Sequence, residues 1–260
     1  MQITQLKDRA RIEAFLRQDP EVHVYSLGDL DDFFWPHTTW YGWEKAGTLR
    51  DIVLVYAGRG LATVVAISRN PPAIRKLLRE VAPLLPTSFY AHLSPGVETV
   101  FKRSHRIKSH GLHYKMALRD PSQVRNIDCS AALRLTAEDR SDLVRLYDES
   151  YPGNWFDPRM LETRQYFGLR TDGELVSVAG IHVYSQQYRV AAIGNVVTHP
   201  AHRDKGYSKL VTARLCQSLS ETVEHIGLNV KVDNAPAMAC YTKLGFESIA
   251  PYGEFTIEKM

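Results

Sequence analysis

One stretch in the second half of the chain decides the fold: residues 196–210 read Val-Val-Thr-His-Pro-Ala-His-Arg-Asp-Lys-Gly-Tyr-Ser-Lys-Leu. An apolar strand ends at Pro200, and a short loop with two cations and Gly206 follows it. Beyond the loop, apolar residues recur at every fourth position, which predicts an amphipathic helix; they are Tyr207, Val211, Leu215 and Leu219. A basic loop that contains glycine therefore stands between a strand and the first turn of a helix.

This loop has the composition of an anion-binding site. The first backbone N–H groups of a helix have no partner within the helix, and the helix dipole favours an anion there. Gly206 lets the main chain approach a bulky anion, and Arg203, Lys205 and Lys209 add positive charge, so we expect a pyrophosphate cradle. The glycine spacing is neither that of a Walker loop nor that of a dinucleotide turn. From this loop alone, a plain strand–turn–helix with a solvated basic turn is an equal alternative.

A second segment, residues 228–245, favours the binding site. Residues 228–234 read as a strand that ends in helix-capping residues, and Pro236 suits the first turn of a helix. That helix is expected over 235–244, and Gly245 is placed to end it.

Both segments resemble motifs of the GNAT N-acetyltransferase superfamily. Arg203-Asp204-Lys205-Gly206-Tyr207-Ser208 is similar to its Arg/Gln-x-x-Gly-x-Gly/Ala loop, and 234–246 (NAPAMACYTKLGF) is similar to its second motif. The resemblance covers about residues 131–260 and is closest to the branch that includes the glycine N-acyltransferase-like proteins, in which a weakly matching half precedes the active one. In place of a phosphate loop, the first half has Arg69-Asn70-Pro71-Pro72-Ala73, with no glycine. The resemblance therefore implies a degenerate N-terminal copy.

Each half is expected to run helix, hairpin, helix, strand, helix, strand, without a close residue-level repeat. The fold class is α+β with a mixed sheet, in two GNAT-like domains: residues 1–120 degenerate, 121–131 a linker, and 132–260 catalytic. The expected helices are 8–17, 73–85, 97–103, 138–147, 157–167, 207–219 and 235–244. The expected strands are 51–56, 61–68, 89–93, 113–118, 175–184, 189–198 and 226–232, with a Gly58-Arg59-Gly60 turn between the first two and further extended pieces after Phe246.

The resemblance also implies where the donor, acetyl-CoA, would bind. The pantetheine arm and thioester would lie along the main chain of Val196, Val197 and Thr198, with the side chain of Arg203 near the pyrophosphate. Main-chain N–H groups over Asp204, Lys205, Gly206, Tyr207, Ser208 and Lys209 would hold the pyrophosphate, and Asn234 would complete the site. Ser208 departs from the usual Gly or Ala, but a small hydroxyl fits there and can donate a hydrogen bond.

Catalytic residues are less evident in the sequence. Transfer to an amine needs a stabilised oxyanion, for which the N–H of Val196 is the expected donor, and a proton for the departing thiolate. The resemblance assigns that proton to Tyr241, whose alternative is a core tyrosine bonded to backbone. No base stands in Ala191-Ala192-Ile193-Gly194-Asn195, although Asn195 could orient a water. His182 is the best remaining candidate base, with Glu174 and His199 behind it.

Composition excludes several other classes of protein. Of the 260 residues, 44% are apolar and 23% charged, as in ordinary globular proteins, and a net charge of +3 argues against a dedicated nucleic-acid binder. No apolar run is long enough for a membrane span, and the charged N-terminal residues do not form a signal peptide, so we expect a cytoplasmic protein. Three cysteines without ligand spacing predict neither disulfides nor a metal site.

Two further clusters receive structural interpretations. Asp29, Asp31 and Asp32 beside aromatic residues suggest the end of a helix, with an acidic, aromatic wall for a cationic substrate as the alternative. The histidines His105, His110 and His113, among Arg and Lys, suggest a solvated basic loop rather than a phosphate site.

These observations predict an N-acetyltransferase that moves the acetyl group of acetyl-CoA directly to a primary amine of a small molecule, held between the halves of a monomer or homodimer. A catalytically silent CoA-binding sensor is one alternative. The other is a nucleotide or sugar-phosphate enzyme that uses the same helix N-terminus.

Overall fold

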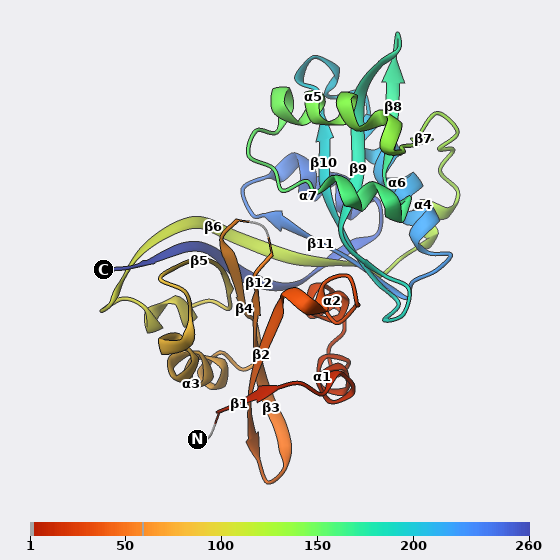
Figure 1. Ribbon diagram of the computed structural model, residues 1–260. Helices are drawn as coiled ribbons and strands as arrows, with labels where there is room; N and C mark the ends of the chain where they lie inside the picture. The colour runs from red at the N-terminus through yellow and green to blue at the C-terminus, as the bar shows by residue number, and fades with distance from the viewer. Residues whose placement is uncertain (1–2, 59) are drawn as a thin grey trace. The chain divides into compact units, whose positions relative to one another are not determined.

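The computed structural model describes residues 3–58 and 60–260, and the chain divides into two compact units (Figure 1). Unit 1 comprises Met1–Lys115, Val230–Asp233 and Ser248–Met260, and unit 2 comprises Met116–Asn229 and Asn234–Glu247. The expected linker 121–131 falls within unit 2 and contains α4 (Ser122–Arg125). The amide of Gln217 donates to the carbonyls of Val124 and Ile127, at 2.9 and 3.0 Å, so this segment is packed.

Unit 1 is a mixed sheet with helices. Its elements are β1 (Ile3–Leu6), α1 (Arg9–Leu16), α2 (Val24–Gly28), η1 (Trp35–His37), β2 (Thr38–Lys45), β3 (Thr48–Tyr56), β4 (Ala62–Ala66), α3 (Pro71–Val81), η2 (Ala82–Leu84), β5 (Ser88–Leu93), η3 (Val97–Val100) and most of β6 (His105–Leu118). The strands follow the order β1-β2-β3-β4-β5-β12-β6, with β4 and β5 parallel.

The last strand of the chain, β12 (Phe246–Lys259), completes the sheet of unit 1. It pairs with β5 in antiparallel register, from Gly253 opposite Leu93 to Glu258 opposite Ser88. Ile257 is fully buried in the same core as α3 and β3–β5. The C-terminal residues are thus part of unit 1, whereas the sequence analysis assigned all of 132–260 to the second domain.

Unit 2 repeats this order of elements. It contains β7 (Leu133–Arg134), η4 (Ala137–Asp139), α5 (Arg140–Ser150), η5 (Pro158–Thr163), β8 (Phe167–Thr171), β9 (Glu174–Ser185), β10 (Val190–Thr198), η6 (Pro200–His202), α6 (Tyr207–Leu219), most of β11 (His225–Lys231) and α7 (Ala235–Lys243). The strand order is β11-β10-β9-β8-β7, and β10 and β11 are parallel. No helix in the described part of the chain is long and apolar enough to span a membrane.

The expected α+β class and most elements are confirmed, including α6 over its whole predicted range. Two expected helices were wrong in type: 97–103 and 157–167 hold only the 3₁₀ turns η3 and η5. Strands β1, β2, β7 and β8 were not predicted. His105, His110 and His113 lie on the long strand β6 rather than in a loop. The β3–β4 hairpin is present, but Arg59 of its predicted turn lies outside the described residues.

Asp51, a buried carboxyl in β3, predicts a pH dependence of stability. Burial raises its pKa to about 7, although it accepts bonds from the Ser68 hydroxyl and the Ile52 N–H. Because the folded pKa lies above the unfolded value, the folded state binds more protons, and stability falls as pH rises from about 4 to 7. In urea titrations, the free energy of unfolding of the unmodified protein should fall by on the order of 3 kcal/mol over that range. The Asp51→Asn variant should not show this fall. Parallel pH profiles for the two proteins would contradict this assignment.

Candidate functional site

The N-terminus of α6 presents unpaired backbone N–H groups at an exposed loop. Gly206 is the N-cap residue, at a φ of +78°, and no side chain caps the helix. The first helical bond runs from the Leu210 N–H to the Gly206 carbonyl, at 3.1 Å. The N–H groups of Tyr207, Ser208 and Lys209 therefore point beyond the end of the helix, where an anion can accept from them.

The loop before α6 is shaped by two left-handed residues. Asp204 has a φ of +62°, which is unusual for a residue other than glycine, and Gly206 shares that conformation. Residues 203–206 are all exposed, and the guanidinium of Arg203 lies 3.4 Å from the Thr198 carbonyl. The Ser208 side chain, by contrast, hydrogen-bonds to Cys240, whose pKa is raised by burial. The hydroxyl that distinguishes this loop thus has a partner on α7.

Before this loop, strand β10 loses its pairing with β11 and forms a bulge against β9. Its parallel pairing with β11 extends from Val190 to Ile193 among the described residues, although both strands continue. Its register with β9 breaks between Gly194 and Val197, and Asn195 there has a φ of +54°. The main chain of Asn195 and Val196 therefore leaves the ladder with β9 at a bulge, and pairing resumes at Val197, opposite Val178.

Asn195 fixes this bulge through a buried hydrogen-bond network, to which both its main-chain carbonyl and its side-chain amide contribute. The carbonyl of Asn195 accepts from the Tyr147 hydroxyl at 2.9 Å. Its amide nitrogen donates to the Trp155 carbonyl at 2.9 Å and to the Tyr166 hydroxyl at 3.1 Å. The sequence pattern does not predict these aromatic partners, because they come from three separate segments. Asn195 holds the strand and the 151–157 loop together.

His182 lies directly against the bulge. A Cβ atom added at Gly194 would be only 2.0 Å from its Cδ2 atom, and the Trp155 ring centroid is 5.9 Å away. The other two candidate bases are engaged elsewhere. His199 caps η6 and lies 3.8 Å from Glu149, and Glu174 is paired with an arginine at the β8–β9 turn.

Tyr241 projects from α7 and is buried, with 8% of its surface exposed. Burial raises the pKa of its hydroxyl, and that hydroxyl makes no hydrogen bond with any described residue. It therefore differs from a core tyrosine whose hydroxyl is bonded to backbone. Asn234 has a structural use, because its side chain accepts from the Ala237 N–H at 3.2 Å and caps α7.

The corresponding helix of unit 1, α3, has a different N-terminus. Pro71 and Pro72 lack N–H groups, and the side chain of Asn70 accepts from the next one, on Ala73. Arg69 is paired with Asp19 at 2.6 Å and also donates to a backbone carbonyl. The donors that α6 offers to an anion are absent or occupied at these described positions.

Comparison with known proteins agrees with the geometry of unit 2. Residues 133–246 match the model of the family described as Acetyltransferase (GNAT). Residues 133–246 are called the GNAT segment below. No curated protein matches the sequence.

Solved structures extend the GNAT likeness to the whole chain. A tandem GNAT protein from the clavulanic acid biosynthesis pathway is 16% identical with a TM-score of 0.58, covering 98% of this chain and 97% of its own. A GNAT-family acetyltransferase from Colwellia psychrerythraea is 14% identical with a TM-score of 0.58, covering all of both chains. A Drosophila protein is 14% identical with a TM-score of 0.71, covering 98% of both. At these identities the likeness concerns the fold.

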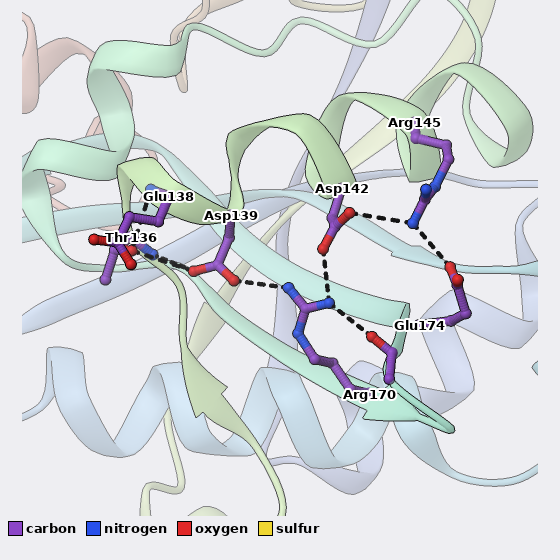
Figure 2. A network of polar contacts seen from close by, with 8 residues as sticks. Thr136, Glu138, Asp139, Asp142, Arg145, Arg170 and Glu174 are labelled. Atoms are coloured by element: carbon purple, nitrogen blue, oxygen red, sulfur yellow. Dashed lines mark hydrogen bonds and ion pairs between the residues drawn. The ribbon is translucent and has the colours of Figure 1, made fainter.

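Within the GNAT segment, a charged network joins α5 to the β8–β9 hairpin (Figure 2). Arg170 donates to Asp139 and Asp142, both at 2.7 Å, and to the carbonyl at the turn. Arg145 donates to Asp142 and Glu174, at 3.1 and 2.8 Å. Glu174 therefore belongs to a structural network, and it is a poor candidate for a catalytic base.

Arg170→Gln should destabilise the protein by roughly 2 kcal/mol, because it leaves two partly buried carboxylates without their shared donor. The matched control is Arg145→Gln, whose side chain is 51% exposed and whose loss should cost less than about 1 kcal/mol. Denaturant unfolding measures both. Equal effects would show that the network does not hold the hairpin.

Proposed function

We propose that the protein is an acetyl-CoA-dependent N-acetyltransferase whose acceptor is a primary amine of a small molecule. The observation that carries the proposal is the uncapped start of α6, where three backbone N–H groups face an exposed loop with Arg203 and Lys205. All of the expected donor-binding residues except Asn234, which caps α7, belong to the consecutive segment formed by β10, this loop and α6. Unit 1 lacks the corresponding donors at α3, which supports a single donor site.

The chemistry would use the bulge and two side chains. The amine nitrogen attacks the thioester carbonyl, and the N–H of Val196 stabilises the oxyanion. The carbon–sulfur bond then breaks, and the Tyr241 hydroxyl, which makes no hydrogen bond with a described residue, gives a proton to the thiolate. His182, packed on Gly194, would take the proton that the amine loses. Among the described residues, no group of three or more His, Cys, Asp or Glu side chains is arranged to hold a metal ion.

The first test is thermal unfolding of the purified protein with acetyl-CoA, free CoA or ADP. A ligand at 100 times its dissociation constant stabilises by about 2.7 kcal/mol, so binding gives a clear shift. We expect a larger shift with acetyl-CoA than with ADP, followed by release of free thiol when primary amines are added. No shift with any of the three would refute the donor site.

Two outcomes would favour the alternatives. Binding of acetyl-CoA without thiol release across a broad panel of amines would favour the catalytically silent sensor. Equal shifts with ADP and acetyl-CoA would favour a nucleotide or sugar-phosphate enzyme at the same helix N-terminus.

Tyr241→Phe tests the acid. We expect kcat to fall by roughly 100-fold, the scale of general acid catalysis, while the acetyl-CoA thermal shift is kept. The variant should remain folded, because the hydroxyl has no partner in the described part of the protein. An unchanged kcat would remove Tyr241 from the mechanism.

A further inference from the structure

A carboxylate in unit 1, Glu254, stands at the centre of a cluster of aromatic side chains. It lies on β12 directly opposite His92 of β5. The Tyr252 hydroxyl donates to its Oε1 at 2.7 Å, and the Tyr90 hydroxyl donates to its Oε2. The Nε2 atoms of His92 and His113 lie 3.5 Å from Oε1 and Oε2, respectively. Each carboxylate oxygen has thus one hydroxyl donor and one imidazole nearby, and each can accept a further hydrogen bond.

When His113 is neutral, its orientation leaves an acceptor facing that carboxylate. Its Nδ1 lies 3.3 Å from the Gly111 carbonyl, which can only accept, so Nδ1 is the donor. In the neutral imidazole, Nε2 then carries a lone pair. A lone pair and a carboxylate oxygen 3.5 Å apart repel each other unless a donor is shared between them. An ammonium group has three N–H donors and could satisfy Nε2 and both oxygens.

The aromatic rings around Glu254 form walls of the kind that stabilise cations. Ring centroids of Tyr252 lie 5.1 and 5.5 Å from those of His92 and His113, and Tyr90 lies 5.5 Å from His92. Unit 1 already uses this chemistry for an internal cation: the Lys115 Nζ lies 4.9 Å from the Tyr25 ring and 5.4 Å from that of Tyr252. The faces of tyrosine rings attract such ions.

Charge in this region favours a further cation. Burial raises the pKa of Asp29 to about 7 and lowers that of Lys115 to about 8. The pKa of Glu254 is lowered, because His92, His113 and the hydroxyls outweigh the effect of its own burial. The Lys115 ammonium is attracted to both Asp29 and Glu254, so one internal ammonium serves two carboxylates.

We propose that Glu254, His92, His113, Tyr90 and Tyr252 form a binding site for the ammonium group of an organic amine. The side chains of Glu254, His92 and His113 are 15%, 19% and 12% exposed, so each is partly open to solvent. All five residues belong to unit 1. The site goes beyond the donor site of unit 2 and does not rest on the proposed acetyl transfer.

The experiment uses the whole chain labelled with ¹⁵N-histidine at pH 7.5, with n-butylammonium chloride as probe and n-butanol as its neutral isostere. Spectra of His92→Gln and His113→Gln assign the two imidazoles. We expect saturable shifts of both imidazoles with butylammonium and none with butanol. Equal shifts with butanol, or a His113 that is already an imidazolium without the probe, would overturn the proposal, because the carboxylate would then have its own internal cation.

Glu254→Gln should weaken butylammonium binding at least tenfold. The matched control is Glu258→Gln, an exposed carboxylate on the same strand, four residues away and on the same face, which should leave binding unchanged. Unweakened binding to a folded Glu254→Gln protein would also overturn the proposal. The acetyl-CoA thermal shift of these variants reports the donor site separately, so failure of one proposal is distinguishable from failure of the other.

Discussion

Gly206→Glu should abolish the thermal stabilisation that acetyl-CoA confers, a loss of about 2.7 kcal/mol at a ligand concentration 100 times the dissociation constant of the unmodified protein. The new carboxylate would stand at the start of α6, among the N–H groups proposed to hold the pyrophosphate. It would repel the anion and occupy its place. The fold itself should tolerate the side chain, because a Cβ atom at Gly206 meets no atom within 4 Å.

Gly173→Glu is the matched control for this variant. Gly173 also has a positive φ, of +83°, and also meets nothing within 4 Å, so backbone strain and added charge are the same. It lies in the β8–β9 turn rather than at the start of α6. We expect its acetyl-CoA shift to be retained. A folded Gly206→Glu protein that binds acetyl-CoA as well as this control would refute the donor site.

Gly245→Ala should cause a large loss of stability, on the order of 3 kcal/mol or more. Gly245 has a φ of +88°, and an added Cβ would lie 2.2 Å from the backbone oxygen of Asp120. Neither partner can move freely, because the Gly245 carbonyl accepts from the N–H groups of Arg119 and Asp120. The substitution therefore combines left-handed strain with a backbone collision.

Gly153→Ala isolates the strain. Gly153 belongs to the same unit, with a φ of +77°, and has nothing within 4 Å of an added Cβ. Its substitution should cost only about 1–2 kcal/mol, the price of a left-handed alanine. Urea unfolding of both variants gives the comparison. Similar losses would show that the contact with Asp120 relaxes easily.

Local signals in the sequence were enough to predict the helices and strands next to the loop of residues 203–206. Asn234 and Gly245 mark the ends of α7, and the four-residue apolar spacing gave α6 without error. Helices were also predicted over 97–103 and 157–167, but only 3₁₀ turns form there. Those segments are short, and in a short segment a turn can bury the apolar side chains as well as an α-helix can.

The sequence by itself determined the basic loop, its glycine and the helix that follows, because a helix start and its N–H donors depend on neighbouring residues. Only the tertiary structure brought Tyr147, Trp155 and Tyr166 to Asn195. Only it placed the C-terminal strand β12 in unit 1, where Glu254 meets His92 and His113. These contacts join residues far apart in the chain. Burial of apolar strand faces selects such neighbours, and no local spacing encodes them.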